Sequence, residues 1–483
     1  MLFNTAEFFW FLIATLAIHY LIPGRLLALR TGFLLVASYS FYLSWELWYV
    51  FLIVPVTLVN YFCGLWINHA EDRQKRLALW VSVVGSLGFL ATFKYADFFA
   101  QNVAVGLTAL GRPTEFELVL HGLPVGVSFF TFQAMSYSID VYRGHIAAER
   151  NVFRFALFVS FFPQLVAGPI EKARNLLTQL QDNLAKARPI APISAIEQIA
   201  FGLFKKVAIA DNIGPYVQPV FADPSAYSGA DILLASVLFS IQIYCDFSGY
   251  TDIAIGTARL FGIRLLDNFN FPYFAANITD FWRRWHISLS AWLKEYLYIS
   301  LGGNRRGLPR MYIALALTML LGGLWHGPSW NFVLWGACHG VYLIVHKLYM
   351  NTVTWCPSGA ALWISHIVTI PITFMLVTLT WIPFVSVDID ATYNAFKHLL
   401  TWAEADTSLA AEQLYLLSLV VAVLVVTDFV RYTARRVKAR AVEDMHALPV
   451  WVVAVHAFLI PVWLQLTAVF GSRSGQEFIY FAF

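Results

Sequence analysis

The sequence is poor in charge. Only 13% of its 483 residues are Asp, Glu, Lys or Arg, whereas 59% are hydrophobic. A soluble chain carries roughly a quarter of its residues charged, so this composition excludes an ordinary soluble protein. Apolar runs long enough to cross a bilayer recur along the chain. They predict an all-α polytopic membrane protein with about 10–12 membrane-crossing helices plus re-entrant and interfacial helices.

The sequence also lacks the patterns that hold metals or nucleic acids. The net charge of +3 gives no overall basic character, so nucleic acid is not expected as a partner. The four cysteines form no CxxC pair, and the 12 histidines form no cluster with zinc-ligand spacing. We therefore expect no metal and no bound cofactor.

Basic loops predict the orientation in the membrane. Lys and Arg gather in residues 71–76, 143–154 and 431–440, which marks these loops as cytoplasmic. The acidic segment 388–406 is then expected on the opposite side. Residues 1–23 lack a basic leader and a small-residue cleavage site, so we expect an uncleaved first span. This pattern places both termini outside the cytoplasm.

No polar linker or internal repeat divides the chain, so we expect one integral membrane domain over residues 1–483. Its expected parts are N-terminal helices in 1–120, a core in 121–350, C-terminal helices in 351–470 and an extracytoplasmic tail in 471–483. Without a soluble domain, any chemistry must take place within the membrane or at its faces. The remaining classes are transport, channel function, lipid or polymer modification, and scaffolding.

Two segments are expected not to cross the membrane. Residues 155–174 have basic residues at both ends and three helix breakers between them, which favours a re-entrant hairpin. Residues 280–299 carry apolar side chains every three to four positions, which predicts an amphipathic interfacial helix with His286 at the border of its apolar face. The basic loop 302–307 that follows could bind lipid phosphates or a donor diphosphate, or simply anchor the cytoplasmic side.

The stretch LLGGLWHGPSWNFVLWGACHG, residues 320–340, places His326 inside a long apolar run. Basic residues before and after 311–350 predict a hairpin with both ends in the cytoplasm and His326 near its turn. An ionisable side chain at membrane depth costs about 2.5 kcal/mol or more and tends to face a partner or a cavity. Histidine is also the commonest general base. The alternative is a core histidine bonded to a carbonyl, and His339 is expected to serve packing. Four neighbours are expected to interrupt the helix around His326: Gly322, Gly323, Gly327 and Pro328.

A second polar group lies in the apolar stretch IQIYCDFSGYTDIAIG, residues 241–256. Asp246 and Asp252 are expected either to pair with a cation, such as an arginine of the interfacial helix, or to form part of a proton path. Structural pairing is the favoured interpretation.

Five motifs occur together in one order along the chain. They are PVGVSFFTFQAMSYSIDVYRG at 124–144, FFPQLVAGPI at 161–170, the stretch 241–256, DFWRRWHISLSAWLKEYLYISLGGNRRG at 280–307, and GGLWHGPSWNFVLWGACHG at 322–340. In this order they resemble the membrane-bound O-acyltransferase (MBOAT) family, most of all its bacterial alginate and peptidoglycan O-acetylation branch. The resemblance extends over the whole chain.

The resemblance implies a ring of helices around a central tunnel. His326 corresponds to the catalytic histidine of the family and His286 to its second histidine, while Trp325, Asn331 and Trp335 are expected to line the tunnel. The ending FIYFAF, residues 478–483, resembles a tail that carries an acyl group on a tyrosine hydroxyl, here Tyr480. The alternative for Tyr480 is an interfacial aromatic anchor.

The resemblance further implies a membrane O-acyltransferase, an O-acetyltransferase, with acetyl-CoA or another acyl thioester as donor substrate. The expected acceptor is an extracytoplasmic polysaccharide or peptidoglycan, and the expected partners are membrane lipid and a separate extracytoplasmic acetyltransferase. The expected location is the bacterial cytoplasmic (inner) membrane. The alternatives are a proton-coupled secondary transporter and a non-catalytic recruiting subunit of an envelope acetylation machine.

Overall fold

The computed structural model describes residues 1–112, 124–166, 168–186, 188–353, 360–404, 411–438, 450–472 and 478–479. In these ranges the chain folds into helices joined by short connections and contains no β-strand. Six helices are long and apolar enough to cross a membrane. They confirm the predicted all-α polytopic class: Leu47–His69, Asp72–Ala109, Gly229–Leu260, Leu308–His326, Ile364–Val385 and Val450–Phe470.

The number of such helices in the described part is smaller than the 10–12 crossings predicted. Two further apolar helices, Ala6–Leu21 and Leu27–Leu43, are shorter. Residues 196–219 are mostly apolar and helical, but this stretch contains Lys205, Lys206 and Asp211, which are buried against other helices. Hydropathy does not distinguish helices buried inside the protein from helices that face lipid. The predicted number of crossings therefore included both kinds.

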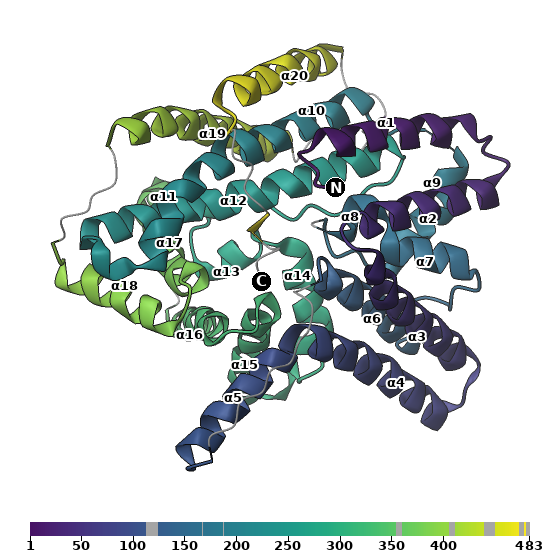
Figure 1. The fold of residues 1–483 in the computed structure, drawn as a ribbon, viewed down its shortest axis with the longest axis horizontal. Coiled ribbons are helices and arrows are strands. Elements are labelled where there is room, and N and C mark those ends of the chain that lie inside the picture. The colour runs from purple at the N-terminus through teal and green to yellow at the C-terminus, as the bar shows by residue number, and fades with distance from the viewer. Residues whose placement is uncertain are drawn as a thin grey trace.

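The N-terminal helices form one side of the molecule (Figure 1). The two-residue connection at 70–71 folds α4 back against α3 as an antiparallel pair. None of the residues of α5 is buried, and this helix projects away from the body. The bounds are α1 Ala6–Leu21, α2 Leu27–Leu43, α3 Val50–His69, α4 Asp72–Leu90, the π-helical turn η2 Ala91–Tyr95, and α5 Ala96–Ala109.

The segment expected as a re-entrant hairpin is a pair of short helices. Helix α7 has nine residues and α8 has four, so α7 rises only about 13 Å and cannot cross a hydrocarbon core of about 30 Å. The break between them falls at Phe161, next to Pro163. The bounds here are α6 Val127–Tyr142, α7 Val152–Ser160, α8 Phe162–Leu165 and α9 Ala173–Lys186.

The long helix α12 passes through the middle of the molecule (Figure 1). It has 32 residues, and the Ser228 side chain caps its start by accepting a hydrogen bond from the Asp231 amide at 3.2 Å. Helices α10 and α11 pack along it, joined by the π-helical turn η3. Their bounds are α10 Pro192–Leu203, η3 Phe204–Ala210, α11 Asp211–Ala222 and α12 Gly229–Leu260.

The predicted amphipathic helix over 280–299 is wrong in two respects. The segment is broken into α13 Ile278–Trp282, α14 Ile287–Trp292 and the π-helical turn η6 Leu293–Tyr298. The break falls at His286, whose φ of +41° is left-handed and incompatible with a continuing helix. The apolar face is correctly identified, but it packs inside the protein and not against lipid: Phe281, Trp285, Leu289, Trp292 and Tyr296 are all buried.

Helices α15 Leu308–His326 and α16 Trp330–Thr352 form the predicted hairpin. The interruption expected at Gly322 and Gly323 is wrong, because α15 continues to His326. These positions instead permit close packing: a Cβ on Gly323 would lie 2.2 Å from the carbonyl oxygen of Phe332 on α16. Helix α15 has 19 residues, about 28 Å, so His326 lies a full membrane thickness from the basic end of the hairpin.

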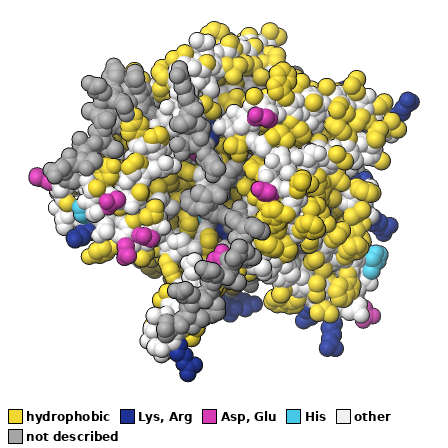
Figure 2. Space-filling model, viewed as in Figure 1, with side chains coloured by type: hydrophobic (Ala, Val, Ile, Leu, Met, Phe, Trp, Pro, Cys, Tyr) yellow, Lys and Arg dark blue, Asp and Glu magenta, His cyan; other side chains and the backbone are white. Residues whose placement is uncertain are grey.

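The C-terminal part adds α17 Ala360–Val385, α18 Ile389–Thr401, α19 Ala411–Lys438 and α20 Val450–Phe470. Helix α18 lies in the acidic segment that the sequence suggested to be a loop, and the Asp388 side chain caps its start. The described chain ends near α13 and α14 in the middle of the molecule (Figure 1). On the face shown in Figure 2, hydrophobic side chains predominate, and most Lys and Arg side chains lie at the rim.

Candidate active site

His326 is the last residue of α15 and is 4% exposed. Its imidazole lies edge to face with three aromatic rings: Trp325 at 5.0 Å, Trp335 at 5.0 Å and Phe384 at 5.3 Å between centroids. Gly327 and Pro328 follow, so the chain leaves the helix directly after the imidazole. The histidine is therefore held at a helix end within an apolar, aromatic surrounding.

A buried lysine holds the backbone at this helix end. Lys94 Nζ donates hydrogen bonds to the carbonyl oxygens of Trp325 at 2.7 Å and His326 at 3.1 Å. The Tyr95 hydroxyl donates to the carbonyl of Leu324 at 2.8 Å. Lys94 and Tyr95 both belong to η2, and π-helical turns of this kind often occur at functional sites. The turn thus satisfies three carbonyls that the end of α15 would leave unpaired.

His286 also lies near Trp325. Its ring centroid is 6.0 Å from that of Trp325, 4.7 Å from that of Phe247 and 6.4 Å from that of Phe129. His286 is fully buried. The loop that carries it is fixed by Asn268, whose backbone carbonyl accepts from the Ile287 amide at 2.9 Å. One indole therefore contacts both histidines named by the sequence.

The three residues expected to line a tunnel occupy different surroundings. Trp325 and Trp335 both contact the His326 ring, and their indole N–H groups find no hydrogen-bond acceptor among the described residues. Asn331 is instead bonded to neighbouring helices: its side chain donates to the Ser386 carbonyl at 2.9 Å and accepts from the Thr392 hydroxyl at 3.2 Å. Asn331 thus joins the start of α16 to α17 and α18.

His339 is a hydrogen-bonded histidine of the interior, as its expected packing role implies. Its Nδ1 accepts from the Trp282 indole at 3.3 Å, and its Nε2 lies 3.0 Å from the Thr380 hydroxyl oxygen. Thr380 donates its own proton to the Val377 carbonyl, so Nε2 is the protonated nitrogen that donates to Thr380. Both ring nitrogens are used.

Asp246 and Asp252 are both paired with cations, but the arginine partner suggested by the sequence is wrong. Asp246 pairs with Lys206 at 2.6 Å and Asp252 with Lys205 at 2.5 Å. Both lysines lie on η3, next to α12. Lys206 also pairs with Asp211 at 2.7 Å.

The C-terminal segment enters this region. The amide of Ile479 donates a hydrogen bond to Asp246 Oδ2 at 2.7 Å. The Phe478 ring is fully buried against Tyr250, with 4.4 Å between centroids. Tyr480, the residue proposed from the sequence as acyl acceptor, lies outside the described residues.

Comparison with known proteins identifies the family. The family model for MBOAT, the membrane-bound O-acyltransferase family, matches residues 34–383. The chain belongs to this family. The predicted membership is thereby confirmed, and the acyltransferase is a multi-pass membrane enzyme.

Similar proteins point to the same chemistry. The acyltransferase is 38% identical to a probable alginate O-acetylase AlgI of Azotobacter vinelandii over 442 residues, which cover 89% of this chain and 86% of the relative. It is 35% identical to the corresponding Pseudomonas putida protein over 508 aligned residues and the full length of both chains. A peptidoglycan O-acetyltransferase of Helicobacter pylori is 36% identical over 393 residues, 76% of this chain and 73% of the relative. These relatives confirm the prediction of an enzyme, an O-acetyltransferase.

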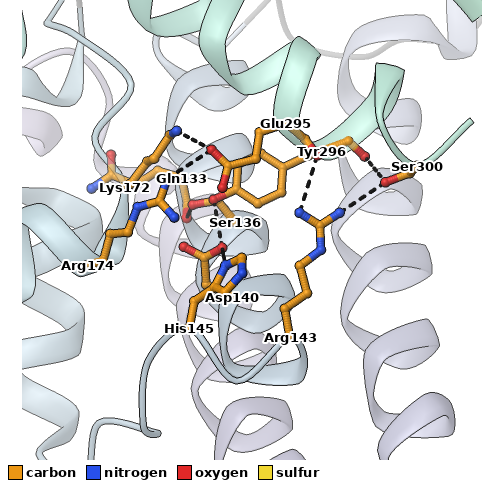
Figure 3. Close-up of polar contacts among 10 residues, drawn as sticks. All are labelled: Gln133, Ser136, Asp140, Arg143, His145, Lys172, Arg174, Glu295, Tyr296 and Ser300. Carbon is orange, nitrogen blue, oxygen red and sulfur yellow. Dashed lines mark hydrogen bonds and ion pairs between the residues drawn. The ribbon is translucent and has the colours of Figure 1, made fainter. Parts of the chain in front are cut away.

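A charged network outside the spanning helices ties the core of the acyltransferase together (Figure 3). Glu295 on η6 pairs with Lys172 and with Arg174, the latter at 2.9 Å. Burial raises the pKa of Glu295, but the bonds to these two cations outweigh it and hold the pKa below its ordinary value. On α6, Asp140 accepts from the Tyr296 hydroxyl at 3.0 Å. The network therefore joins η6 to α6 and to the start of α9.

The same network contains a group of three possible metal ligands among the described residues, Asp140, His145 and Glu295. Glu295 is already neutralised by two cations, and an added divalent ion would lie beside both of them. This chemistry favours an ion-pair network and not a metal centre.

An open cleft of about 860 Å³ lies between α9 and the loop after α12. Its described lining includes Lys186, Arg188 and Arg264 and no acidic residue. The Gln179 side chain fixes the loop by bonding both the amide and the carbonyl of Arg264 at 2.8 Å. The cleft can take an anionic ligand, because its described lining carries three positive charges and no carboxylate.

Sequence reasoning missed three buried lysines, Lys94, Lys205 and Lys206. Each interrupts a run that was interpreted as a plain span, and an ionisable residue within such a run is itself a signal of a partner. Their partners lie between 5 and 232 residues away along the chain. A charged residue in an apolar run could therefore have pointed to the lysines, but not to the groups that they bind.

Proposed function

We propose that the protein transfers an acetyl group from a cytoplasmic acyl thioester, such as acetyl-CoA, toward the outer side of the membrane, where it serves O-acetylation of a polysaccharide or peptidoglycan. The observation that carries the proposal is His326, buried among aromatic rings at the end of α15 with its backbone held by Lys94. The relatives named as alginate O-acetylases and peptidoglycan O-acetyltransferase support the acetyl group and the class of acceptor.

In the proposed reaction, His326 acts as general base toward an acceptor hydroxyl. The imidazole takes the hydroxyl proton as the oxygen attacks the thioester carbonyl carbon. The carbon–sulfur bond then breaks, and the proton passes from His326 to the leaving thiolate. An ester and a free thiol result, without any change of oxidation state. An apolar aromatic surrounding favours this role because it keeps water from competing with the acceptor.

His286 is the second residue of the proposed site. Its ring contacts that of Phe247 and lies 6.0 Å from that of Trp325, which also contacts His326. We assign to it the positioning of the donor or the polarisation of the reacting carbonyl, because a buried neutral imidazole can donate a hydrogen bond without carrying charge. Its left-handed backbone lies at the break before α14, and the residue is fully buried there.

The proposed acceptor hydroxyl within the chain is that of Tyr480. A phenol has a pKa near 10 and attacks slowly unless a base removes its proton. Tyr480→Phe removes the oxygen and keeps the aromatic ring, so we expect acetyl transfer to the polymer to fall by about 10²-fold or more. The measurement is polymer acetylation in cells, with equal amounts of the two proteins in the membrane. Full acetylation by Tyr480→Phe would rule out the acceptor role.

The cleft of Lys186, Arg188 and Arg264 supports a phosphate-bearing donor. Arg264→Glu replaces a basic residue of the cleft with an acidic one. We expect it to raise the KM for acetyl-CoA about tenfold and to leave kcat within about twofold of the parent value. The matched control is Arg76→Glu near the start of α4, which is exposed and does not line the cleft. An equal rise in KM for both variants would contradict binding in the cleft.

The proposed location is the cytoplasmic (inner) membrane of a bacterium, with both termini on the extracytoplasmic side. We also propose a separate extracytoplasmic acetyltransferase as partner. The described chain consists of helices and short connections, with no extended domain that could bind a long glycan. The partner would therefore choose the acceptor polymer.

A further inference from the structure

We infer that Asp246, held by Lys206, is an anchor that fixes the C-terminal segment in the core beside His286, and so acts as a positioning residue for acyl transfer. Its importance for activity rests on the proposed function, in which the tail carries the acyl acceptor. The anchor itself rests on contacts of Phe478 and Ile479, which are described.

The first observation is that the two carboxylate oxygens of Asp246 bind different partners. Oδ1 pairs with Lys206 at 2.6 Å, and Oδ2 accepts the Ile479 amide at 2.7 Å. Asp246 is 2% exposed, and Lys206 and Asp211 are 1% exposed. A buried ion pair is tolerated when the remaining lone pairs are also bonded. The Ile479 amide therefore helps to stabilise the buried Asp246 carboxylate. In return, the carboxylate accepts a short, charge-assisted hydrogen bond from that amide.

The second observation is the packing of Phe478 directly before the bonded amide. Its side chain is fully buried, and its ring lies 4.4 Å from that of Tyr250 and 5.9 Å from that of Phe247. Asp246, Phe247 and Tyr250 all lie on α12. One helix thus holds the segment both by a ring contact and by a hydrogen bond. Phe478 does not serve as an interfacial aromatic anchor.

The third observation connects this anchor to the histidines. The Phe247 ring that contacts Phe478 also lies 4.7 Å from the His286 ring, edge to face. From His286 the aromatic contacts continue through Trp325 to His326. Ile479 immediately precedes Tyr480 in the sequence. The anchor therefore holds Phe478 and Ile479, the residues directly before the proposed acceptor, within this group of aromatic contacts.

Asp252 provides a matched control six residues further along α12. It also pairs with a lysine of η3, Lys205 at 2.5 Å, and accepts from the Gln198 side chain at 2.9 Å. It makes no contact with Phe478 or Ile479 among the hydrogen bonds and ion pairs of the described residues. Loss of Asp252 removes an ion pair of the same kind and leaves the tail contacts in place.

The experiment measures how readily the tail leaves its position. A cysteine at residue 479 keeps the backbone amide, and its reaction with a maleimide reports its exposure. In purified full-length protein with the four native cysteines replaced, Asp246→Ala and the milder Asp246→Asn are compared with Asp252→Ala. We expect both Asp246 variants to react about tenfold faster than the parent protein and Asp252→Ala to react at the parent rate. Unchanged labelling in both Asp246 variants, or an equal rise in Asp252→Ala, would overturn the anchor.

A change in the tail itself tests the anchor without disturbing the core. Ile479→Pro removes the amide donor and leaves the Asp246–Lys206 pair in place, whereas Ile479→Ala keeps the donor. We expect acetyl transfer per folded molecule to fall about tenfold more in Ile479→Pro than in Ile479→Ala. Equal transfer by these two variants, together with faster labelling in the Asp246 variants, would leave the anchor in place and contradict the proposed role of the tail.

Discussion

Two buried histidines on the α15–α16 hairpin differ in how their rings are used. His339 has both nitrogens bonded, to Trp282 and Thr380. The His326 ring lies against Trp325, Trp335 and Phe384 at the end of a helix. Trp335 contacts both rings, at 5.0 Å and 4.8 Å between centroids. Burial alone therefore does not separate a structural histidine from a catalytic one, whereas the bonds of both His339 nitrogens to α13 and α17 assign His339 to the structure.

This difference predicts opposite behaviour on replacement of His339. His339→Ala leaves a cavity and removes one hydrogen bond each from the Trp282 indole and the Thr380 hydroxyl, so we expect it to destabilise the protein by about 2–4 kcal/mol. The melting temperature in detergent should fall, while acetyl transfer per folded molecule stays within about twofold of the parent protein. Loss of transfer in His339→Ala without a change in melting temperature would instead place His339 in the catalytic machinery.

At the residue scale the sequence identified His326 and His286 because a polar ring in an apolar run is conspicuous. It did not identify Lys94, which lies in an equally apolar run. The carbonyls that Lys94 binds are 231 and 232 residues away along the chain. Such a pairing depends on how distant helices pack, and periodicity within one segment carries no information about it.

At the scale of elements, close contact between α15 and α16 determines where His326 lies. The glycines near the turn were expected to break the helix, but Gly323 and Gly336 face each other across the contact. A Cβ on Gly336 would lie 2.4 Å from the carbonyl oxygen of Met319, which cannot move without breaking the turn of α15. The sequence analysis interpreted Gly323 as a helix breaker, whereas in the structure it allows close packing against α16.

The packing explanation predicts different effects for two glycines on one helix. Gly336→Ala forces α15 and α16 apart, so we expect the protein to lose about 2 kcal/mol or more of stability together with most of its activity. Gly340→Ala places its Cβ 3.5 Å from the Met319 side chain, an ordinary contact, and should be neutral in both. The checks are thermal unfolding in detergent and acetyl transfer. Equal effects of the two substitutions would contradict close packing at Gly336.

At the scale of the whole molecule, composition and hydropathy predicted the class correctly. Six described helices are suited to span a membrane, and the family model covers residues 34–383. The interior was less predictable, because the stretch from α10 to α11 resembles a span in its apolar residues but buries charged pairs inside the protein. Helices α13 and α14 were also misplaced, since a buried aromatic face and a lipid-facing one have the same spacing.

The central claim is that the molecule carries out covalent acyl transfer with His326 as the base, and does not merely move a group or an ion across the membrane. The most direct measurement supplies radiolabelled acetyl-CoA to the purified protein and follows label that becomes covalently attached to the chain or to an added acceptor. The account predicts label with the parent protein and a loss of about 10²–10⁴-fold in His326→Ala, at a similar melting temperature. Full labelling by His326→Ala, or no covalent label with the parent protein, would contradict it.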